Sequence, residues 1–257
     1  MKNRQRLLLF DLDDTLLSSD KTISIANKDA LCKCAAMGMR IGYVTARSPR
    51  KVGSFLEGLP CDGIAYYNGA TIFADTLVEK NEISYHQGIE TILQIQQAYL
   101  SAKIGVYLEP YNYFDGILYH IPTGEKVEGT IADLPKYDIQ RIRIVFPEDS
   151  NIELQPYLCD QMNHYVTSDG TAIIVNERAN KAHAAKTLAD HFQIPLADVI
   201  AFGDDVNDID MLQSAGIGVA MGNAADYVKA AADAVTDTND NDGVALWINE
   251  NLLTGKI

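Results

Sequence analysis

The chain has 257 residues, of which 47% are hydrophobic and 22% are charged. This composition excludes a largely disordered chain and suits either one large α/β domain or a core with a smaller second domain. The formal net charge of −14 argues against binding to nucleic acid or to an anionic membrane, because both partners would be repelled.

Neither a secretion signal nor a membrane span is evident in the sequence. The apolar run that follows the basic N-terminal residues has four members before Asp11 interrupts it, which is too short for the core of a signal peptide. No other run approaches the length that spans a bilayer. The four cysteines lack metal-finger spacing and are expected to be reduced thiols. We therefore expect a cytoplasmic protein with no membrane and no nucleic-acid partner.

The N-terminal part of the chain is predicted to contain repeated βα units. Short apolar runs indicate buried parallel strands, and longer periodic segments between them indicate helices. The expected elements are a strand at Leu7–Phe10, a helix at Ile25–Gly38, a strand at Arg40–Val44, a helix at Pro49–Gly58 and a strand at Ile64–Tyr67.

The pattern changes between Ile83 and Glu177, where alternating strands and separated helices suggest an inserted α+β unit with an antiparallel sheet. The expected elements there are a helix within Gly88–Ala102, strands at Ile104–Tyr107, Gly116–Ile121 and Arg141–Phe146, and a helix at Ile152–Met162.

The βα pattern resumes at Asn180, with a helix expected at Lys181–Phe192, strands at Asp198–Phe202 and Gly216–Met221, and a closing helix near Gly243–Leu252. The predicted fold is α/β: a Rossmann-like, three-layer core with a mainly parallel sheet, plus the inserted α+β domain. We expect residues 1–81 and 179–257 to form the core and residues 82–178 to form the insertion.

Polar groups of complementary kinds follow several of the predicted strands or open a helix. They are Asp11 and Asp13, Thr45, Lys181, and the acidic run that contains Asp204, Asp205, Asn207 and Asp208. The carboxyl ends of parallel strands meet at one edge of a sheet, where ligands bind. Carboxylates there can hold Mg²⁺, while a hydroxyl, an amide and an ammonium bind phosphate oxygens. Each group alone could be an ordinary turn or a solvated side chain, but the combination points to phosphoryl transfer.

In this order, the segments Asp11–Leu17, Thr45–Arg47, Lys181 and Gly203–Asp208 resemble the four motifs of the haloacid dehalogenase-like hydrolases. Further matches at Asn68–Ala70, Gly218–Ala224 and Asp242–Ala245 are similar to the Cof-type branch of that superfamily. The resemblance implies a phosphatase with an α/β cap of type B between the second and third motifs.

The resemblance also implies roles for individual residues. Asp11 would be the nucleophile that forms an aspartyl-phosphate, and Asp13 would be the general acid and base. The groups implied to bind the substrate phosphate are Leu12 and Ala46 through their amides, Thr45, Lys181 and Asn207. The groups implied to hold Mg²⁺ are Asp11, the backbone carbonyl of Asp13, Asp204 and Asp208, with Asp205 left as an alternative support.

Two positions depart from the family pattern, because Asp14 and Ala46 stand where glycine is usual. Ala46 can still offer its amide unless the position needs a positive φ. Asp14 tolerates a left-handed conformation, but its carboxylate could weaken substrate binding or join the metal ligands.

The expected function is Mg²⁺-dependent hydrolysis of small phosphorylated metabolites, sugar phosphates above all, with specificity provided by the inserted domain. The enzymatic alternative is a sugar phosphomutase of the same superfamily. A phosphoaspartate signalling receiver is a third interpretation, although such a domain is about half this length. The sequence leaves a monomer and a homodimer equally open.

Overall fold

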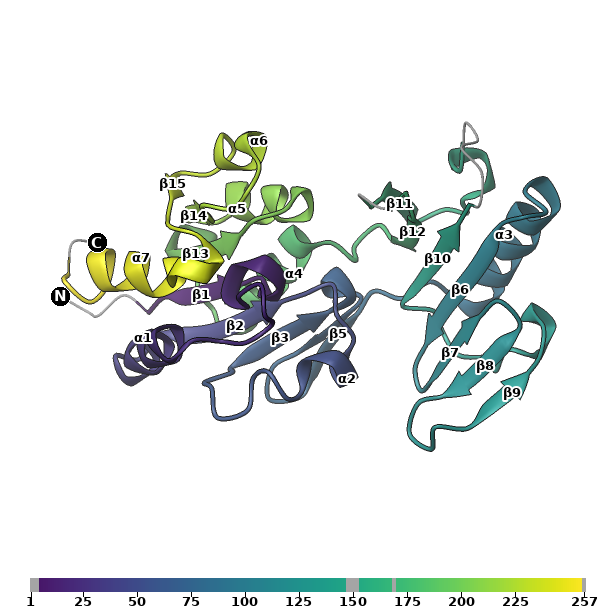
Figure 1. Ribbon diagram of the computed structural model, residues 1–257, viewed down its shortest axis with the longest axis horizontal. Coiled ribbons are helices and arrows are strands. Elements are labelled where there is room, and N and C mark those ends of the chain that lie inside the picture. The colour runs from purple at the N-terminus through teal and green to yellow at the C-terminus, as the bar shows by residue number, and fades with distance from the viewer. Residues whose placement is uncertain (1–4, 147–152, 168–169, 256–257) are drawn as a thin grey trace. The chain divides into compact units, whose positions relative to one another are not determined.

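The computed structural model describes residues 5–146, 153–167 and 170–255. The chain divides into two compact units, one formed by Met1–Lys80 with Asn180–Ile257 and the other by Asn81–Ala179 (Figure 1). Among the described residues, no helix combines the length and the apolar character needed to cross a bilayer.

The first unit is built on an eight-stranded sheet with the order β15-β14-β13-β1-β2-β3-β4-β5. All pairings from β15 to β3 are parallel, and β4 and β5 add an antiparallel edge. The strands are β1 (Leu7–Phe10), β2 (Arg40–Val44), β3 (Gly63–Tyr66), β4 (Thr71–Phe73), β5 (Leu77–Lys80), β13 (Val199–Gly203), β14 (Ile217–Ala220) and β15 (Ala234–Val235).

Helices cover both faces of this sheet, which explains why β1 has no polar residue. Leu8 and Phe10 pack in a core shared with α1 and α7, whereas Leu7 and Leu9 pack in a second core shared with α4, α5 and α6. Successive strand residues point to opposite faces, so a strand buried on both sides must be apolar throughout. The helices are α1 (Ile25–Ala36), α2 (Pro49–Val52), α4 (Lys181–His191), α5 (Ile209–Ser214), α6 (Asp226–Lys229) and α7 (Gly243–Asn251).

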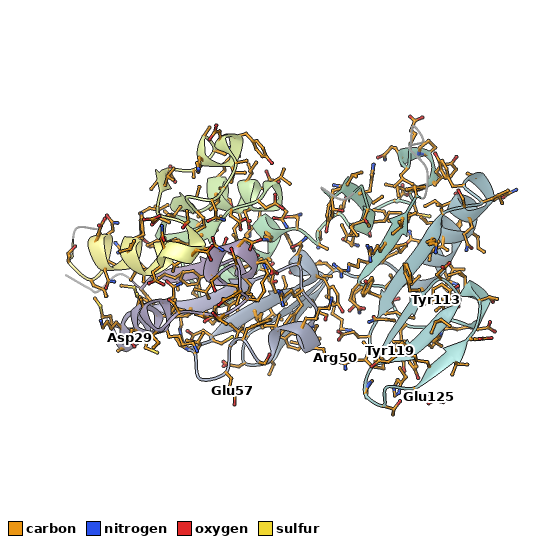
Figure 2. All side chains as sticks on the ribbon, in the orientation of Figure 1. Asp29, Arg50, Glu57, Tyr113, Tyr119 and Glu125 are labelled. Atoms are coloured by element: carbon orange, nitrogen blue, oxygen red, sulfur yellow. The ribbon has the colours of Figure 1, made fainter. Side chains whose placement is uncertain are left out.

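The second unit contains a seven-stranded antiparallel sheet with the order β11-β12-β10-β6-β7-β8-β9. In Figure 2, Tyr113 and Tyr119 lie on its neighbouring strands β7 and β8. The helix α3 contributes Ile92 and Ile95 to the core of the unit. The elements are α3 (Tyr85–Ala98), β6 (Lys103–Leu108), β7 (Tyr111–Phe114), β8 (Ile117–His120), β9 (Lys126–Glu128), β10 (Arg141–Val145), β11 (Met162–Val166) and β12 (Ala172–Asn176).

The predicted fold class, a mainly parallel α/β core with a separate antiparallel sheet, is confirmed. The helix expected at Ile152–Met162 is wrong in its described part, since Gln155–Tyr157 forms one 3₁₀ turn and Met162 already begins β11; Ile152 lies outside the described residues. Pro156 stands inside this segment, where a helix would lose a backbone hydrogen bond. Strands β7 and β9 were not expected, and α2 ends at Val52, before Gly53, rather than at Gly58.

Candidate active site

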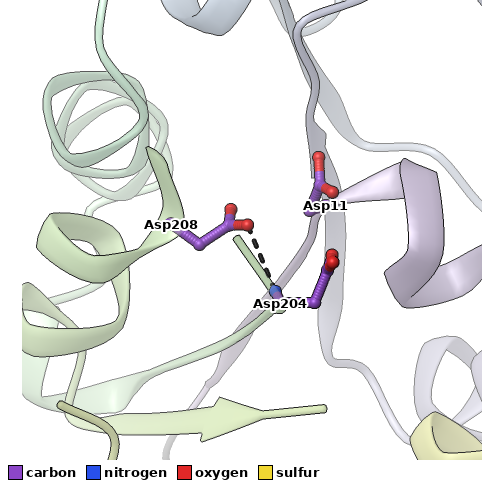
Figure 3. A group of neighbouring side chains, drawn as sticks. All are labelled: Asp11, Asp204 and Asp208. Atoms are coloured by element: carbon purple, nitrogen blue, oxygen red, sulfur yellow. Dashed lines mark hydrogen bonds between the residues drawn. The ribbon is translucent and has the colours of Figure 1, made fainter. Parts of the chain in front are cut away.

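The two central strands of the parallel sheet deliver carboxylates to the same edge. Phe10 of β1 lies in register with Phe202 of β13, and the Asp11 amide donates to the Phe202 carbonyl at 3.0 Å. Asp11 and Asp204 therefore emerge side by side at the carboxyl ends of neighbouring strands. Asp208 joins them from the turn before α5, so that ligand oxygens of the three residues lie within 4.8 Å of one another (Figure 3).

Asp208 is fixed by a capping arrangement at the turn Val206–Asp208. Its Oδ2 accepts hydrogen bonds from the amides of Asp204 at 3.2 Å and Asp205 at 3.1 Å. The close approach requires a residue without a side chain before Asp204, because a Cβ added to Gly203 would lie 2.5 Å from the Asp208 Cβ. Asp205 is exposed and caps the turn, so Asp208, and not Asp205, joins Asp204 and Asp11 in the cluster.

Lys181 is the first residue of α4, and its ammonium group is buried among the carboxylates. The Asn180 side chain caps this helix by accepting from the His183 amide at 2.8 Å. Lys181 Nζ lies 2.7 Å from Asp11 Oδ1 and 2.7 Å from Asp208 Oδ1. The side chain is 2% exposed, and those of its partners are 7% and 0% exposed, so these are charge-assisted contacts out of reach of bulk water.

Burial dominates the electrostatics of this cluster. It raises the pKa of Asp11 well above its usual range, and the attraction of Lys181 offsets only part of the effect. Burial alone would lower the pKa of Lys181, but the charges of Asp11 and Asp208 outweigh it and raise that pKa. Burial, aided by the Asp208 charge, raises the pKa of Asp204 to about 7, against the lowering effect of a hydrogen bond from Thr15. The site therefore holds more carboxylate than its single ammonium neutralises.

A hard divalent cation suits this donor set. Asp11, Asp204 and Asp208 offer three oxygen ligands close together, and Mg²⁺ prefers a few carboxylate oxygens completed by water and substrate phosphate. A cation there would also relieve the repulsion from Asp208, which adds to the effect of burial on the pKa values of Asp11 and Asp204. The residues present thus fit the Mg²⁺ that the sequence predicts.

The carboxylate of Asp13 lies outside this cluster and is held by Arg47. Arg47 Nε donates to Oδ2 and Nη2 to Oδ1, each at 2.6 Å, which makes a bidentate pair. Lys21 Nζ lies 3.4 Å from Oδ1. The hydrogen bonds from Arg47 lower the pKa of Asp13, although partial burial opposes them. Asp13 is therefore ionised at neutral pH, whereas Asp11, two positions earlier, has its pKa raised.

The remaining predicted phosphate ligands lie on the same loops. Thr45 directly follows β2 and is fully buried; its Oγ1 accepts from the Arg47 backbone amide at 3.1 Å and keeps its own proton free to donate. Ala46 follows it, and Leu12 opens the turn after Asp11. Asn207 precedes Asp208, and its Oδ1 is buried without a hydrogen bond among the described residues. Such an orphaned atom is costly unless a ligand or water satisfies it.

Comparison with known proteins decides the family. The sequence pattern of the haloacid dehalogenase-like hydrolases matches residues 8–248 of the chain. The chain belongs to this family. The match spans every motif on which the predicted resemblance rests, so that resemblance is confirmed.

Relatives of this haloacid dehalogenase-like (HAD-like) hydrolase are similar to it over nearly their whole length. The chain is 28% identical over 268 residues to the 5-amino-6-(5-phospho-D-ribitylamino)uracil phosphatase YitU of Bacillus subtilis, covering 97% of this chain and 98% of the relative. The structure of the phosphatase BT1666 from Bacteroides thetaiotaomicron superposes with a TM-score of 0.83 at 25% identity, covering 97% and 96% of the two chains. The subclass IIB sugar phosphatase BT4131 gives a TM-score of 0.80 at 23% identity, with 96% and 98% covered, and so shares the fold.

The two departures from the family pattern are accommodated in this HAD-like hydrolase. Asp14 adopts the left-handed conformation with φ of 56°, and its Oδ1 accepts from Lys21 Nζ at 2.9 Å. Its half-exposed carboxylate thus pairs with Lys21 outside the group of Asp11, Asp204 and Asp208. Ala46 is not among the described residues with positive φ, so this position does not need glycine.

Three residues of the site had no predicted role. Arg47 and Lys21 hold Asp13, and Thr15 Oγ1 donates to Asp204 Oδ1 at 2.7 Å. Arg47 and Thr15 lie within the motifs that carry the family resemblance, which was the available signal. Their partners, Asp13 and Asp204, lie in the segments that follow other strands, so spacing along the chain could not identify these pairs.

Proposed function

We propose that this HAD-like phosphatase hydrolyses small phosphorylated metabolites, sugar phosphates above all, with Mg²⁺ and through an aspartyl-phosphate on Asp11. The observation that carries the proposal is the buried contact of Lys181 with Asp11 and Asp208, beside Asp204, at the end of a parallel sheet. A buried nucleophilic carboxylate next to a fixed ammonium suits attack on a phosphoryl group, because the ammonium also attracts the anionic substrate.

In the first step, a carboxylate oxygen of Asp11 attacks phosphorus and the bond from phosphorus to the leaving alkoxide oxygen breaks. The products of this step are an acyl phosphate on Asp11 and an alcohol, whose oxygen takes a proton from Asp13. In the second step, water attacks phosphorus, gives a proton to Asp13 and releases inorganic phosphate and free Asp11. Division into two steps lowers the barrier of a difficult hydrolysis.

The Arg47 contact bears on how Asp13 moves protons. Because it lowers the pKa of Asp13, the resting carboxylate is ionised and ready to accept the proton of the attacking water. To protonate the leaving oxygen in the first step, Asp13 must first bind a proton, which the Arg47 contact opposes. We therefore expect the proton to reach Asp13 only when the guanidinium has loosened its hold.

The other predicted ligands would hold the transferring group in place. Lys181, the Thr45 hydroxyl, the backbone amides of Leu12 and Ala46 and the Nδ2 group of Asn207 would donate hydrogen bonds to the phosphate oxygens. The orphaned Oδ1 of Asn207 is an acceptor, so it would take a hydrogen bond from a donor such as water. Mg²⁺ would be held by Asp11, Asp204 and Asp208, with the Asp13 carbonyl, and would neutralise phosphate charge.

The inserted unit, residues 82–178, is proposed to act as a cap that provides specificity, and residues 1–81 and 179–257 are proposed to form the catalytic core. Cap domains exclude water and contact the part of the substrate that leaves. The relative YitU acts on a phosphorylated ribityl compound, and BT4131 is a sugar phosphatase. Phosphate esters of polyols and sugars are therefore the substrate class to test first.

The test is an assay of the purified protein with Mg²⁺ against a chromogenic aryl phosphate and a panel of sugar and ribityl phosphates. Asp11→Asn should lower turnover by about three orders of magnitude or more, as expected for loss of a nucleophile. The exposed Asp210→Asn, also near the acidic run, is the matched control and should retain activity. Equal turnover by Asp11→Asn and wild type would refute the mechanism.

Two further measurements test the aspartyl-phosphate intermediate and the phosphomutase alternative. Acid-quenched reactions should contain a phosphorylated peptide that includes Asp11, and none in the Asp11→Asn protein. Turnover that requires a sugar bisphosphate activator would instead favour a phosphomutase.

A further inference from the structure

The turn that follows β3 has an unusual backbone. Tyr67, Asn68 and Gly69 have consecutive positive φ angles of 52°, 59° and 109°. Non-glycine residues rarely adopt this region, and a bulky residue such as tyrosine does so only where the surroundings impose it. Tyr67 and Asn68 are buried, at 2% and 4% exposed, so packing rather than solvent determines the turn. The turn Tyr67–Gly69, which overlaps the Asn68–Ala70 motif, has no role in the mechanism derived above.

On one side, the turn is hydrogen-bonded to the loop that carries Thr45. The backbone N–H of Asn68 donates to the Thr45 carbonyl at 2.8 Å, and the backbone N–H of Tyr67 donates to the Arg47 carbonyl at 3.1 Å. These bonds fix the backbone on both sides of Ala46. The Thr45 hydroxyl and the Ala46 amide are consequently held by the left-handed turn.

On its other side, the turn supports the start of α4. A Cβ added to Gly69 would lie 3.1 Å from the Asn180 carbonyl oxygen and 3.1 Å from the Ala184 Cβ. Asn180 is the N-cap of α4, and Lys181 is the next residue. The absence of a side chain at Gly69 thus sets how closely the first turn of α4 approaches β3.

We propose that the Tyr67–Gly69 turn positions the two halves of the phosphate-binding site, Thr45 on one loop and Lys181 on α4, relative to each other. Gly69 is the positioning residue that sets their separation. The inference rests on the proposed function, because it takes Thr45 and Lys181 as phosphate ligands. The strained turn then has a mechanical role, since one rigid element ties two ligands that come from distant parts of the sequence.

Gly69→Ala should displace Lys181 without touching it. The new methyl group meets backbone, which cannot rotate away, so the N-cap and the residue after it must shift. Lys181 makes two contacts of 2.7 Å, so a small shift disturbs both. A displacement of about 1 Å can lower the rate by about 10², so the shift of a few tenths of an ångström that a 3.1 Å contact demands should cost about tenfold.

Gly38→Ala is the matched control for backbone strain. Gly38 lies two residues after the end of α1 with φ of +86°, which disfavours alanine in the same way, but a Cβ there would meet nothing within 4 Å. Both substitutions should therefore lower the melting temperature, whereas only Gly69→Ala should disturb the phosphate site.

The experiment measures the affinity for inorganic phosphate by calorimetry in the presence of Mg²⁺, together with kcat and KM for the aryl phosphate. Gly69→Ala should bind phosphate several-fold more weakly and lose about tenfold in kcat/KM, whereas Gly38→Ala should keep wild-type values. A folded Gly69→Ala protein that matches Gly38→Ala in both measurements would overturn the proposal.

Asn68 provides a second test in case Gly69→Ala does not fold. Both substitutions keep the backbone N–H that donates to the Thr45 carbonyl. Asn68→Gly also allows the positive φ, whereas Asn68→Ala disfavours it. Phosphate affinity should fall more in Asn68→Ala than in Asn68→Gly, and the reverse order contradicts the proposal. A wild-type protein that binds phosphate without hydrolysing esters refutes the proposed function, yet the affinities still decide the role of the turn; one that binds no phosphate refutes both.

Discussion

Replacement of Lys181 by methionine should destabilise the metal-free protein strongly. The change removes the cation between Asp11 and Asp208 while it keeps the length and bulk of the side chain. Because all three side chains are 7% exposed or less, two carboxylates are left buried without their counter-ion. Loss of one partner of a buried ion pair costs about 3–5 kcal/mol in the free energy of unfolding.

Two conditions should reduce this loss. The pKa of Asp11 is already raised by burial and rises further without Lys181, so the folded variant binds a proton more tightly than the unfolded chain. Its stability deficit is then largest above that raised pKa and shrinks as the pH falls through it. Mg²⁺ should also restore part of the stability, because a ligand that binds only the folded state stabilises it.

The assay is urea unfolding followed by the fluorescence of Trp247, the single tryptophan, which is buried in the core of the first unit. The control is Lys186→Met, on the same helix, where the lysine is more than half exposed and pairs with Asp190 one turn away. That variant should lose about 0.5 kcal/mol or less. A loss below about 1 kcal/mol in Lys181→Met at pH 8 without Mg²⁺ would refute the reasoning, since breaking a buried pair costs several times more.

Three further outcomes are expected. Asp14→Gly should change kcat/KM and the Mg²⁺ affinity by no more than about fivefold, because the exposed pair with Lys21 is worth about 1 kcal/mol or less; a larger change would place Asp14 among the metal ligands. Burial raises the pKa of Asp204 to about 7, so protons compete with the metal and the Mg²⁺ affinity measured by calorimetry should fall about tenfold from pH 8 to pH 6; a flat profile contradicts this. Burial raises the pKa of Cys34 to about 11, so at pH 8 a disulfide reagent should modify exposed Cys32 first, and equal rates would contradict the burial of Cys34.

The sequence allowed accurate prediction where a strand was buried on both faces. The apolar runs before Asp11 and Asp204 could only be central strands, and the parallel sheet then brought their carboxyl ends together. By contrast, the segment at 155–162 has apolar residues with helical spacing, yet a single 3₁₀ turn buries Leu154 against the core of its unit. Tertiary contacts overruled the local pattern there.

The sequence predicted which residues form the site better than it predicted the contacts between them. Lys181 could be expected near a phosphate, but its equal contacts with Asp11 and Asp208 depend on the close approach that Gly203 allows. The ion pair between Asp13 and Arg47 joins segments that follow two different strands. The sequence does not indicate which basic side chain a given carboxylate pairs with. Such choices are set by distances that only the folded sheet defines.

The position of β1 in the middle of the parallel sheet has a consequence for biosynthesis. Its neighbour on one side, β2, is made soon afterwards, but the other, β13, pairs Val199 with Leu7 and is made about 190 positions later. The inserted unit, a contiguous segment from Asn81 to Ala179, is complete before then and can fold as the chain leaves the ribosome. Nascent chains therefore carry Asp11 beside an unpaired strand edge until synthesis has passed Asp208. The catalytic cluster can assemble only after the whole inserted unit has been made, through a pairing between strands that lie far apart in the sequence.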